Sequence, residues 1–325
     1  MIRKVDVSHK TIFFITAFLL LLWVVYLILD IILLLFVAFI FVSALDPLVN
    51  RLVGWRIPRS LAAAAILIGV AALIIGLLTI SFTPILNQTT NLSQALGQTV
   101  NSLVRANLVD QNTIQNELSN FSKQAISITL VIFQNIIAFA TLIVITFYLL
   151  LDKARLEGVV ISFFVGHQDI VKNLFDRIQE KLGAWLRGQL LLSLIIGVVV
   201  YVGLTLLGIK YALPLAILAG LFEIVPVIGP IIASVPAVLL GLSVSPLLAA
   251  LVAGFYLVVQ QVENQVIVPQ VMKRAVGLNP ILVILSVSIG GRLLGIPGAL
   301  LAVPIAVVIQ VIAEGLLEGS TSSPA

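Results

Sequence analysis

The sequence of 325 residues has no cysteine, only two histidines and few charged side chains. Without cysteine there are no disulfides, thiolate metal sites, iron–sulfur clusters or cysteine nucleophiles. The histidines, His9 and His167, lie far apart in polar segments, so we expect neither a metal centre nor a cofactor. Charged residues make up 10% of the chain, against about 25% in soluble domains. This scarcity of charge excludes an ordinary water-soluble globule.

Familiar nucleotide-binding and catalytic motifs are also missing. The chain contains no G-x-x-x-x-G-K-[ST] sequence, which would cradle ATP phosphates. It contains no H-E-x-x-H zinc motif and no G-x-S-x-G nucleophile turn. We therefore do not expect an enzyme, and we do not expect ATP to supply energy within this chain.

Apolar sequence dominates what is present. Hydrophobic residues make up 61% of the chain, and the mean hydropathy is +1.21. A helix needs about 20 apolar residues to cross the hydrocarbon core of a bilayer. The apolar runs predict an all-α polytopic membrane protein with about eight membrane helices, some broken or re-entrant, and a small helical extracytoplasmic lobe. The lipid bilayer is its first expected partner.

The first apolar run and the polar stretches divide the chain. The run from Thr11 to Leu45 is interrupted by Asp30, which predicts an uncleaved helical hairpin with Asp30 at its tip. Beyond it, the apolar and polar stretches alternate. We expect three membrane helices in 1–82, the extracytoplasmic lobe in 83–125, a fourth membrane helix in 126–151, a cytoplasmic amphipathic segment in 152–186, a membrane domain with two Pro/Gly-broken hairpins in 187–313, and a cytoplasmic tail in 314–325.

The net charge of +4 comes from lysines and arginines in loops. The amino terminus has three, the 46–60 loop three, the 152–186 segment five and the turn at Lys273–Arg274 two. An even number of crossings separates these groups if 213–242 is a hairpin, so all can be cytoplasmic. We expect both termini to be cytoplasmic, and this placement of charge argues against a nucleic-acid partner.

Two apolar stretches, 221–230 and 289–298, are interrupted by proline and glycine. Irregular backbone at membrane depth survives only where protein or water satisfies its polar groups, and such breaks often mark the site of a transporter. A polar cluster after the seventh apolar span adds two further candidates. The expected pathway-lining or hinge residues are Pro226, Gly229, Pro230, Gly290, Gly291, Gly295, Pro297 and Gly298, with Gln261 and Asn264 from the polar cluster.

Glu223 and Arg292 are the ionisable residues most clearly inside apolar sequence. A charge at the bilayer centre costs about 2.5–3.5 kcal/mol or more, so we expect the two to lie close together, as an ion pair or across one polar cavity. Glu223 then binds a proton or cation, and Arg292 contacts an anion or balances the charge. Glu263 is a second candidate acid. The alternative is that both sit at an interface, where Arg292 snorkels, and that Gln261 and Asn264 form a solvated helix end.

With these residues in view, the sequence resembles the autoinducer-2 exporter family of bacterial permease-like proteins. The resemblance covers nearly the whole chain, and the order and spacing of its motifs carry it. The matching motifs are Asp46-Pro47, Ile57-Pro58-Arg59, Leu186-Arg-Gly-Gln189, Glu223-Ile-Val-Pro-Val-Ile-Gly-Pro230, Gln261-Val-Glu-Asn264 with Pro269, Val276-Gly-Leu-Asn-Pro280, and Gly295-Ile-Pro-Gly298 with Pro304.

The resemblance implies a bacterial inner-membrane transporter that exports a small polar solute similar to autoinducer-2. Because the chain has no ATP-binding motif, we expect a proton or sodium gradient to drive the export. Some family members resemble sodium/proton antiporters, so a monovalent cation/proton antiporter is the alternative. A membrane scaffolding protein that acts through the 83–125 lobe is an alternative of another class. The G-x-x-x-G spacing of Gly291 and Gly295 favours close helix packing and leaves a homo-oligomer open.

Overall fold

The computed structural model describes residues 9–80, 136–225, 228–242, 244–275, 277 and 279–321. Every regular element in these ranges is a helix, and none of them contains a strand. The predicted all-α class is confirmed. The expected 83–125 lobe lies outside the described residues.

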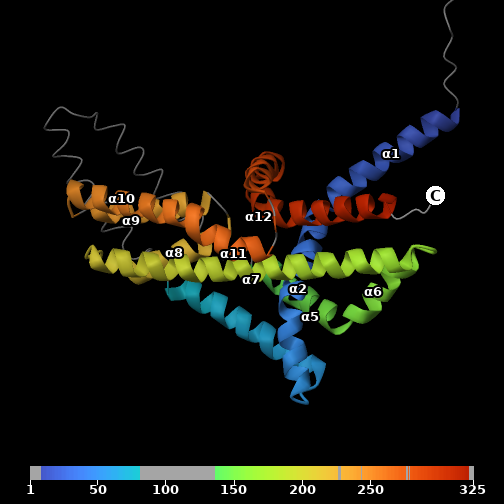
Figure 1. The fold of residues 1–325 in the computed structure, drawn as a ribbon, viewed down its shortest axis with the longest axis horizontal. Coiled ribbons are helices and arrows are strands. Elements are labelled where there is room, and N and C mark those ends of the chain that lie inside the picture. Colours follow the sequence, from blue (N-terminus) through green and yellow to red (C-terminus); the bar gives the residue numbers. More distant parts are fainter. Residues whose placement is uncertain are drawn as a thin grey trace, which may run out of the picture.

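Figure 1 shows the order and arrangement of the described helices. Their bounds are α1 His9–Leu27, α2 Leu29–Gly54, an unlabelled helix Arg59–Ile80, α5 Ile136–Leu151, α6 Lys153–Ser162, α7 Gln168–Leu206, α8 Ala212–Phe222, α9 Ile228–Leu242, α10 Pro246–Val262, the π-helix η1 Glu263–Ile267, α11 Val268–Ala275 and α12 Pro280–Thr321.

Membrane helices account for most of these elements. Six of the described helices are long and apolar enough to cross a membrane. The number is seven if α5 and α6, which meet at a bend of 76°, form one span. The helices α8 and α9 are apolar but shorter. The chain is therefore a multi-pass membrane protein, and the sequence-based expectation of about eight membrane helices is close to this count.

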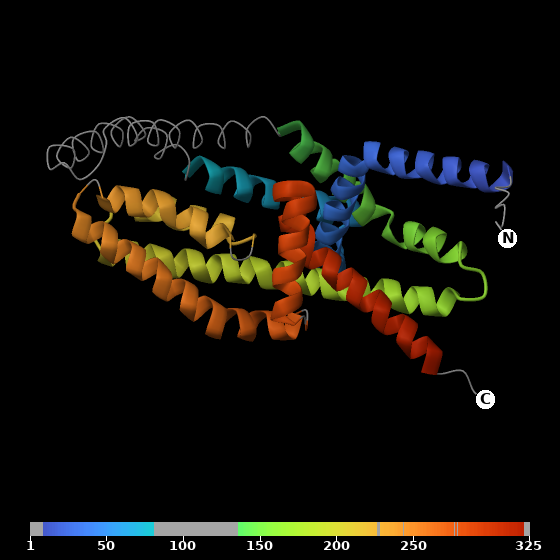
Figure 2. The same cartoon turned by 90° about the horizontal axis from the view of Figure 1, so that it is seen from above.

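The long helix α7 forms the axis of the molecule (Figures 1 and 2). It contacts α2, α6, α8, α10, α11 and α12. Its carboxy-terminal half shares a hydrophobic core with α8, α9 and α10, and residues near its middle share another with α2 and α12. Because α7 is continuous from Gln168 to Leu206, the boundary expected at 186–187 is not a break in the backbone.

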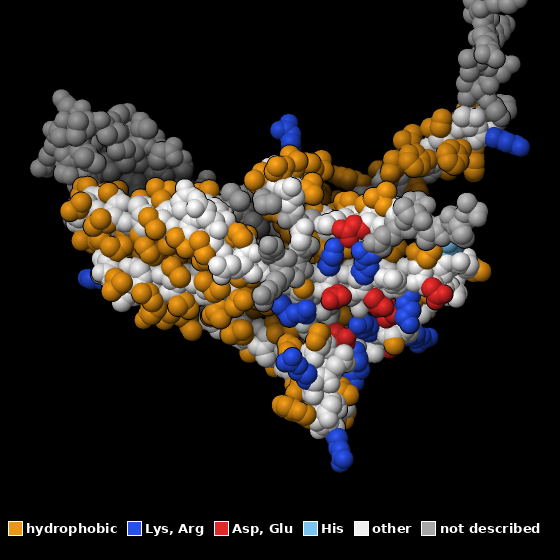
Figure 3. Space-filling view, viewed as in Figure 1, with side chains coloured by type: hydrophobic (Ala, Val, Ile, Leu, Met, Phe, Trp, Pro, Cys, Tyr) orange, Lys and Arg blue, Asp and Glu red, His pale blue; other side chains and the backbone are white. Residues whose placement is uncertain are grey.

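Charged side chains gather over α6 and the amino-terminal half of α7, whereas the opposite end of the molecule is apolar (Figure 3). Glu314 on α12 lies against this half of α7, with its Oε2 3.1 Å from an Arg177 nitrogen and 3.4 Å from Lys181 Nζ. The helix α12 continues to Thr321. The first residues of the expected 314–325 tail are therefore helical and attached to α7.

The first helix makes few contacts with the rest of the chain. The helices α1 and α2 meet at Ile28, close to Asp30. They make few contacts with each other, so the expected hairpin with Asp30 at its tip is not formed. The most apolar window of α1, Lys10–Leu27, has no buried residue, and Figure 1 shows α1 directed away from the other helices. In a membrane such a surface faces lipid, because apolar side chains are as stable against acyl chains as against protein.

Asp46 holds three helical segments together. The carboxylate of Asp46, 8% exposed, lies 2.7 Å from an Arg59 nitrogen and 2.8 Å from Lys153 Nζ. Arg59 Nε also donates to the Leu150 carbonyl at 2.9 Å, and another Arg59 nitrogen donates to Asn50 Oδ1 at 2.9 Å. These bonds join α2, the helix Arg59–Ile80 and the bend between α5 and α6, and they give the Asp-Pro and Pro-Arg motifs a structural role.

We expect Asp46→Ala to lower the free energy of unfolding by about 1.5–3 kcal/mol, because it leaves two cationic groups without their shared acceptor. Thermal unfolding in detergent measures the change. Asp152→Ala is the matched control, because Asp152 precedes Lys153 but is exposed and makes no capping hydrogen bond. Equal melting temperatures for Asp46→Ala and Asp152→Ala would show that the network does not hold the helices together.

Candidate functional site

Glu223 lies where α8 ends inside the protein. Its side chain is 2% exposed, and the chain leaves the helix at the following residues. Gly229 at the start of α9 is packed against the backbone of Phe222 and Glu223, with no room for a Cβ atom. The absence of a side chain at Gly229 therefore lets α9 begin directly against the end of α8.

Glu263 begins the π-helix η1 that follows α10. Single π-helical turns within longer helices often occur at functional sites, because they re-aim a side chain. Glu263 is 3% exposed, whereas its neighbours Val262 and Asn264 are exposed. Glu263 continues the buried face of α10, because Tyr256, Val259 and Glu263 lie three to four residues apart.

The two carboxyl groups meet. Glu223 and Glu263 are neighbours that interact electrostatically, and Oε2 of each is buried without a hydrogen-bond partner among the described residues. Two adjacent carboxylates in a poorly hydrated interior repel each other, and each loses hydration. The pair is therefore suited to hold a proton or a small cation between its oxygens, which replaces the repulsion with an attraction.

Gln189 on α7 fixes the backbone at this site. Its Nε2 donates to the Glu223 carbonyl at 2.6 Å, and Gln189 is itself 2% exposed. The helices α7 and α8 approach closely here, because Gly220 lies against the Ser193 carbonyl with no space for a Cβ atom. This close approach lets the Gln189 side chain span the distance from α7 to the Glu223 carbonyl. The motif Leu186-Arg-Gly-Gln189 by itself does not indicate this role, since the partner of Gln189 lies 34 positions away in the chain.

Arg292 makes no contact with Glu223 among the described interactions. It is exposed on α12, and no ion pair or hydrogen bond joins it to Glu223 in the described structure. The expected ion pair of Glu223 with Arg292 is therefore not seen among the described residues. The neighbour of Glu223 is the second acid, Glu263, and Arg292 is exposed on α12.

The second broken stretch folds into a tight hairpin within α12. The chain reverses at Gly295, which has φ +64°, a conformation that favours glycine. Gly290 and Gly298 then lie backbone to backbone, with no room for a Cβ atom on either.

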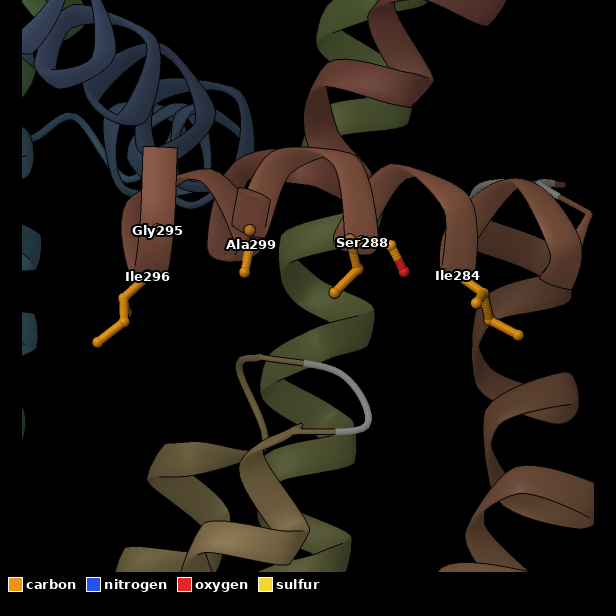
Figure 4. Close-up of a pocket in the computed structure, with 7 residues that line it drawn as sticks. Ile284, Ser288, Gly295, Ile296 and Ala299 are labelled. Carbon is orange, nitrogen blue, oxygen red and sulfur yellow. The ribbon is translucent and has the colours of Figure 1, made fainter. Parts of the chain in front are cut away.

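An open groove of about 580 Å³ runs along this hairpin, and Figure 4 shows side chains from both arms pointing to one side of it. The groove is lined by Ile284, Val287, Ser288, Gly291, Gly295, Ile296 and Ala299.

The remaining candidates have different environments. Pro230 is buried beside Gly229, whereas Pro297 is exposed after the turn of α12. Gln261 and Asn264 are both exposed, and Gln261 accepts a hydrogen bond from Gln265 at 3.3 Å. Pro226 lies outside the described residues. Of the predicted site residues, the structure thus joins Glu223, Glu263, Gly229 and Pro230 in one region and places the glycines of α12 in another.

Buried polar groups held between interrupted helices of a multi-pass membrane protein are typical of membrane transporters. Comparison with known families agrees with this class. Residues 12–318 match the family described as AI-2E family transporter, and the chain belongs to that family. The resemblance inferred from the motifs is confirmed.

Relatives of this chain cover it to different extents. The AI-2 transport protein TqsA of Escherichia coli (strain K12) is 26% identical over 306 residues, 88% of this chain and 86% of TqsA. YhhT of the same strain is 28% identical over 305 residues, 90% of this chain and 86% of YhhT. YrrI of Bacillus subtilis (strain 168) is 33% identical over 134 residues, 41% of this chain and 38% of YrrI. The chain spans 38% of YrrI and 59% of YueF, also from Bacillus subtilis.

We expect Gly229→Ala to destabilise the protein by about 1–3 kcal/mol, because the added methyl group collides with the Phe222 carbonyl at the end of α8. Gly254→Ala on α10 is the control, since nothing lies within 4 Å of the added Cβ, and it should be neutral or slightly stabilising. Thermal unfolding of both variants in detergent gives the comparison. A Gly229→Ala protein as stable as the Gly254→Ala protein would contradict the close contact between α8 and α9.

Proposed function

We propose that the protein exports a small polar solute across the bacterial inner membrane, and that Glu223 and Glu263 couple this export to a proton or sodium gradient. The buried pair of carboxyl groups is the observation that carries the coupling proposal. Membership of the AI-2E family and the likeness to TqsA support a solute such as autoinducer-2. The charge distribution along the sequence supports cytoplasmic termini.

The coupling proposal rests on the electrostatic free energy of the Glu223–Glu263 pair. A proton or monovalent cation between the two carboxyl groups removes one negative charge from an apolar region, so occupied and empty states differ strongly in electrostatic free energy. The site sits at an interruption between α8 and α9 and at a π-helical turn, where backbone geometry changes most easily. Binding or release of the ion can therefore favour one arrangement of the helices over another.

The exposed Arg292 supplies a positive charge for an anionic or strongly polar solute within this proposal. The hairpin of α12 that carries it has its turn at Gly295, three residues beyond Arg292. The groove along that hairpin is mostly apolar, with Ser288 as its polar lining residue. We assign the groove to helix or lipid packing, and we assign solute contact to the side of α12 that carries Arg292.

A monovalent cation/proton antiporter is the second candidate, and the same carboxyl pair favours it. An antiporter needs a site at which a proton and a cation compete, and two facing carboxyl groups provide such a site. Scaffolding through residues 83–125 requires no buried acids, so the site gives it no support.

The test is proton movement in proteoliposomes with an internal pH dye, after addition of sodium, lithium or autoinducer-2. We expect the wild-type protein to respond, and we expect Glu223→Gln and Glu263→Gln each to lower the initial rate by at least about tenfold, since neither retains two carboxyl groups. A response to sodium or lithium supports the antiporter, whereas a response to autoinducer-2 alone supports the exporter.

Glu180→Gln is the matched control for these variants, because Glu180 is an exposed acid on α7. It should transport at the wild-type rate. Loss of activity in all three Gln variants would reflect altered folding or reconstitution rather than coupling. Full activity in both Glu223→Gln and Glu263→Gln would refute the coupling proposal.

A further inference from the structure

Gln189 is a buried polar residue that bonds to the backbone of the candidate site without contacting either carboxyl group in the described hydrogen bonds. Its Nε2 lies 2.6 Å from the Glu223 carbonyl oxygen. Both residues are 2% exposed, so water does not compete for this bond. A buried amide with one strong bond in this location indicates a specific positional role.

The acceptor of this bond explains why a side chain is needed. Helices leave their last carbonyl groups without intrahelical partners, and Glu223 directly follows the end of α8. The hydrogen bond from Gln189 satisfies one of these carbonyls inside the protein. It also fixes the point at which the backbone turns toward α9, and therefore the direction in which the Glu223 side chain leaves the backbone.

We propose that Gln189 is a positioning residue that holds Glu223 against Glu263 and thereby sets the affinity of the pair for its ion. This inference rests on the proposed function for its consequence in transport, but its structural part does not. The bond links α7, the axis of the molecule, to the break between α8 and α9. Without it, the Glu223 carboxyl group is free to move away from Glu263.

A second glutamine on the same helix provides a control. Gln179 is also on α7 and also buried, at 8% exposure, but its Nε2 has no hydrogen-bond partner among the residues that the structure describes. Methionine has nearly the length of glutamine and lacks an N–H donor. Gln189→Met and Gln179→Met therefore remove the same group from the same helix, and they differ in whether a bond to the site is lost.

The first experiment measures position and uses the absence of native cysteine. Glu223→Cys combined with Glu263→Cys is treated with a short bifunctional methanethiosulfonate, and the cross-linked product is followed by mass spectrometry. We expect Gln189→Met in this background to slow cross-linking by about tenfold, the effect of losing one buried hydrogen bond, and Gln179→Met to leave the rate unchanged. Equal rates in the two backgrounds would overturn the positioning role. No cross-link with Gln189 intact would contradict the pair itself.

The second experiment measures function in otherwise native proteoliposomes titrated with sodium chloride and, separately, with autoinducer-2. We expect Gln189→Met to raise the half-saturating concentration of the titrated sodium or autoinducer-2 about tenfold. The maximal transport rate per folded protein should stay within about twofold of the wild-type rate. A purely structural role predicts the reverse, a lower maximal rate with an unchanged half-saturating concentration, and that result would overturn the inference.

The two experiments separate the two proposals. Slower cross-linking together with a wild-type protein that responds to no solute or cation would support the positioning of Glu223 and refute the proposed transport function. Unchanged cross-linking and half-saturation in Gln189→Met, with loss of activity in Glu223→Gln, would keep the proposed function and refute the role of Gln189.

Discussion

Two carboxyl groups held side by side in an apolar interior lose hydration and repel each other when both are charged. Glu223 and Glu263 nevertheless meet in this protein, at 2% and 3% exposure. Their environment is built from the end of α8, the π-helical turn after α10 and the Gln189 side chain on α7. The packing of the surrounding helices offsets this electrostatic cost. A bound ion or proton removes the repulsion, so the pair favours binding of either one.

Close backbone contact is the means by which the helices pack so tightly around the site. Gly220 brings α8 against α7, and Gly229 brings α9 against the end of α8. Gly290 and Gly298 do the same within α12. Small residues at such contacts are typical of membrane proteins, where dispersion contacts replace the hydrophobic effect as the force between helices. Of the glycines predicted as hinges, Gly229, Gly290 and Gly298 thus admit neighbouring backbone.

Ion pairs act away from the acid pair, where the charged side chains gather. Asp46 joins Arg59 and Lys153, and Glu314 joins Arg177 and Lys181. Both clusters connect segments far apart in the sequence, so each ties the helical axis or the first helices to later parts of the chain. They fix the arrangement around the charged half of the molecule, while the acid pair lies beside Gln189 near the middle of α7.

Apolar periodicity and composition determined by themselves that the chain is an all-α membrane protein, because length and hydropathy alone decide whether a helix can cross a bilayer. They also indicated Glu223, because an acid in apolar sequence needs a partner. The identity of that partner required the tertiary structure. Opposite charge suggested Arg292, but packing brought Glu263 instead, and sequence separation gave no sign that Gln189 would bond to Glu223. Hydropathy is a local property of the chain, whereas side-chain contacts depend on how distant helices pack.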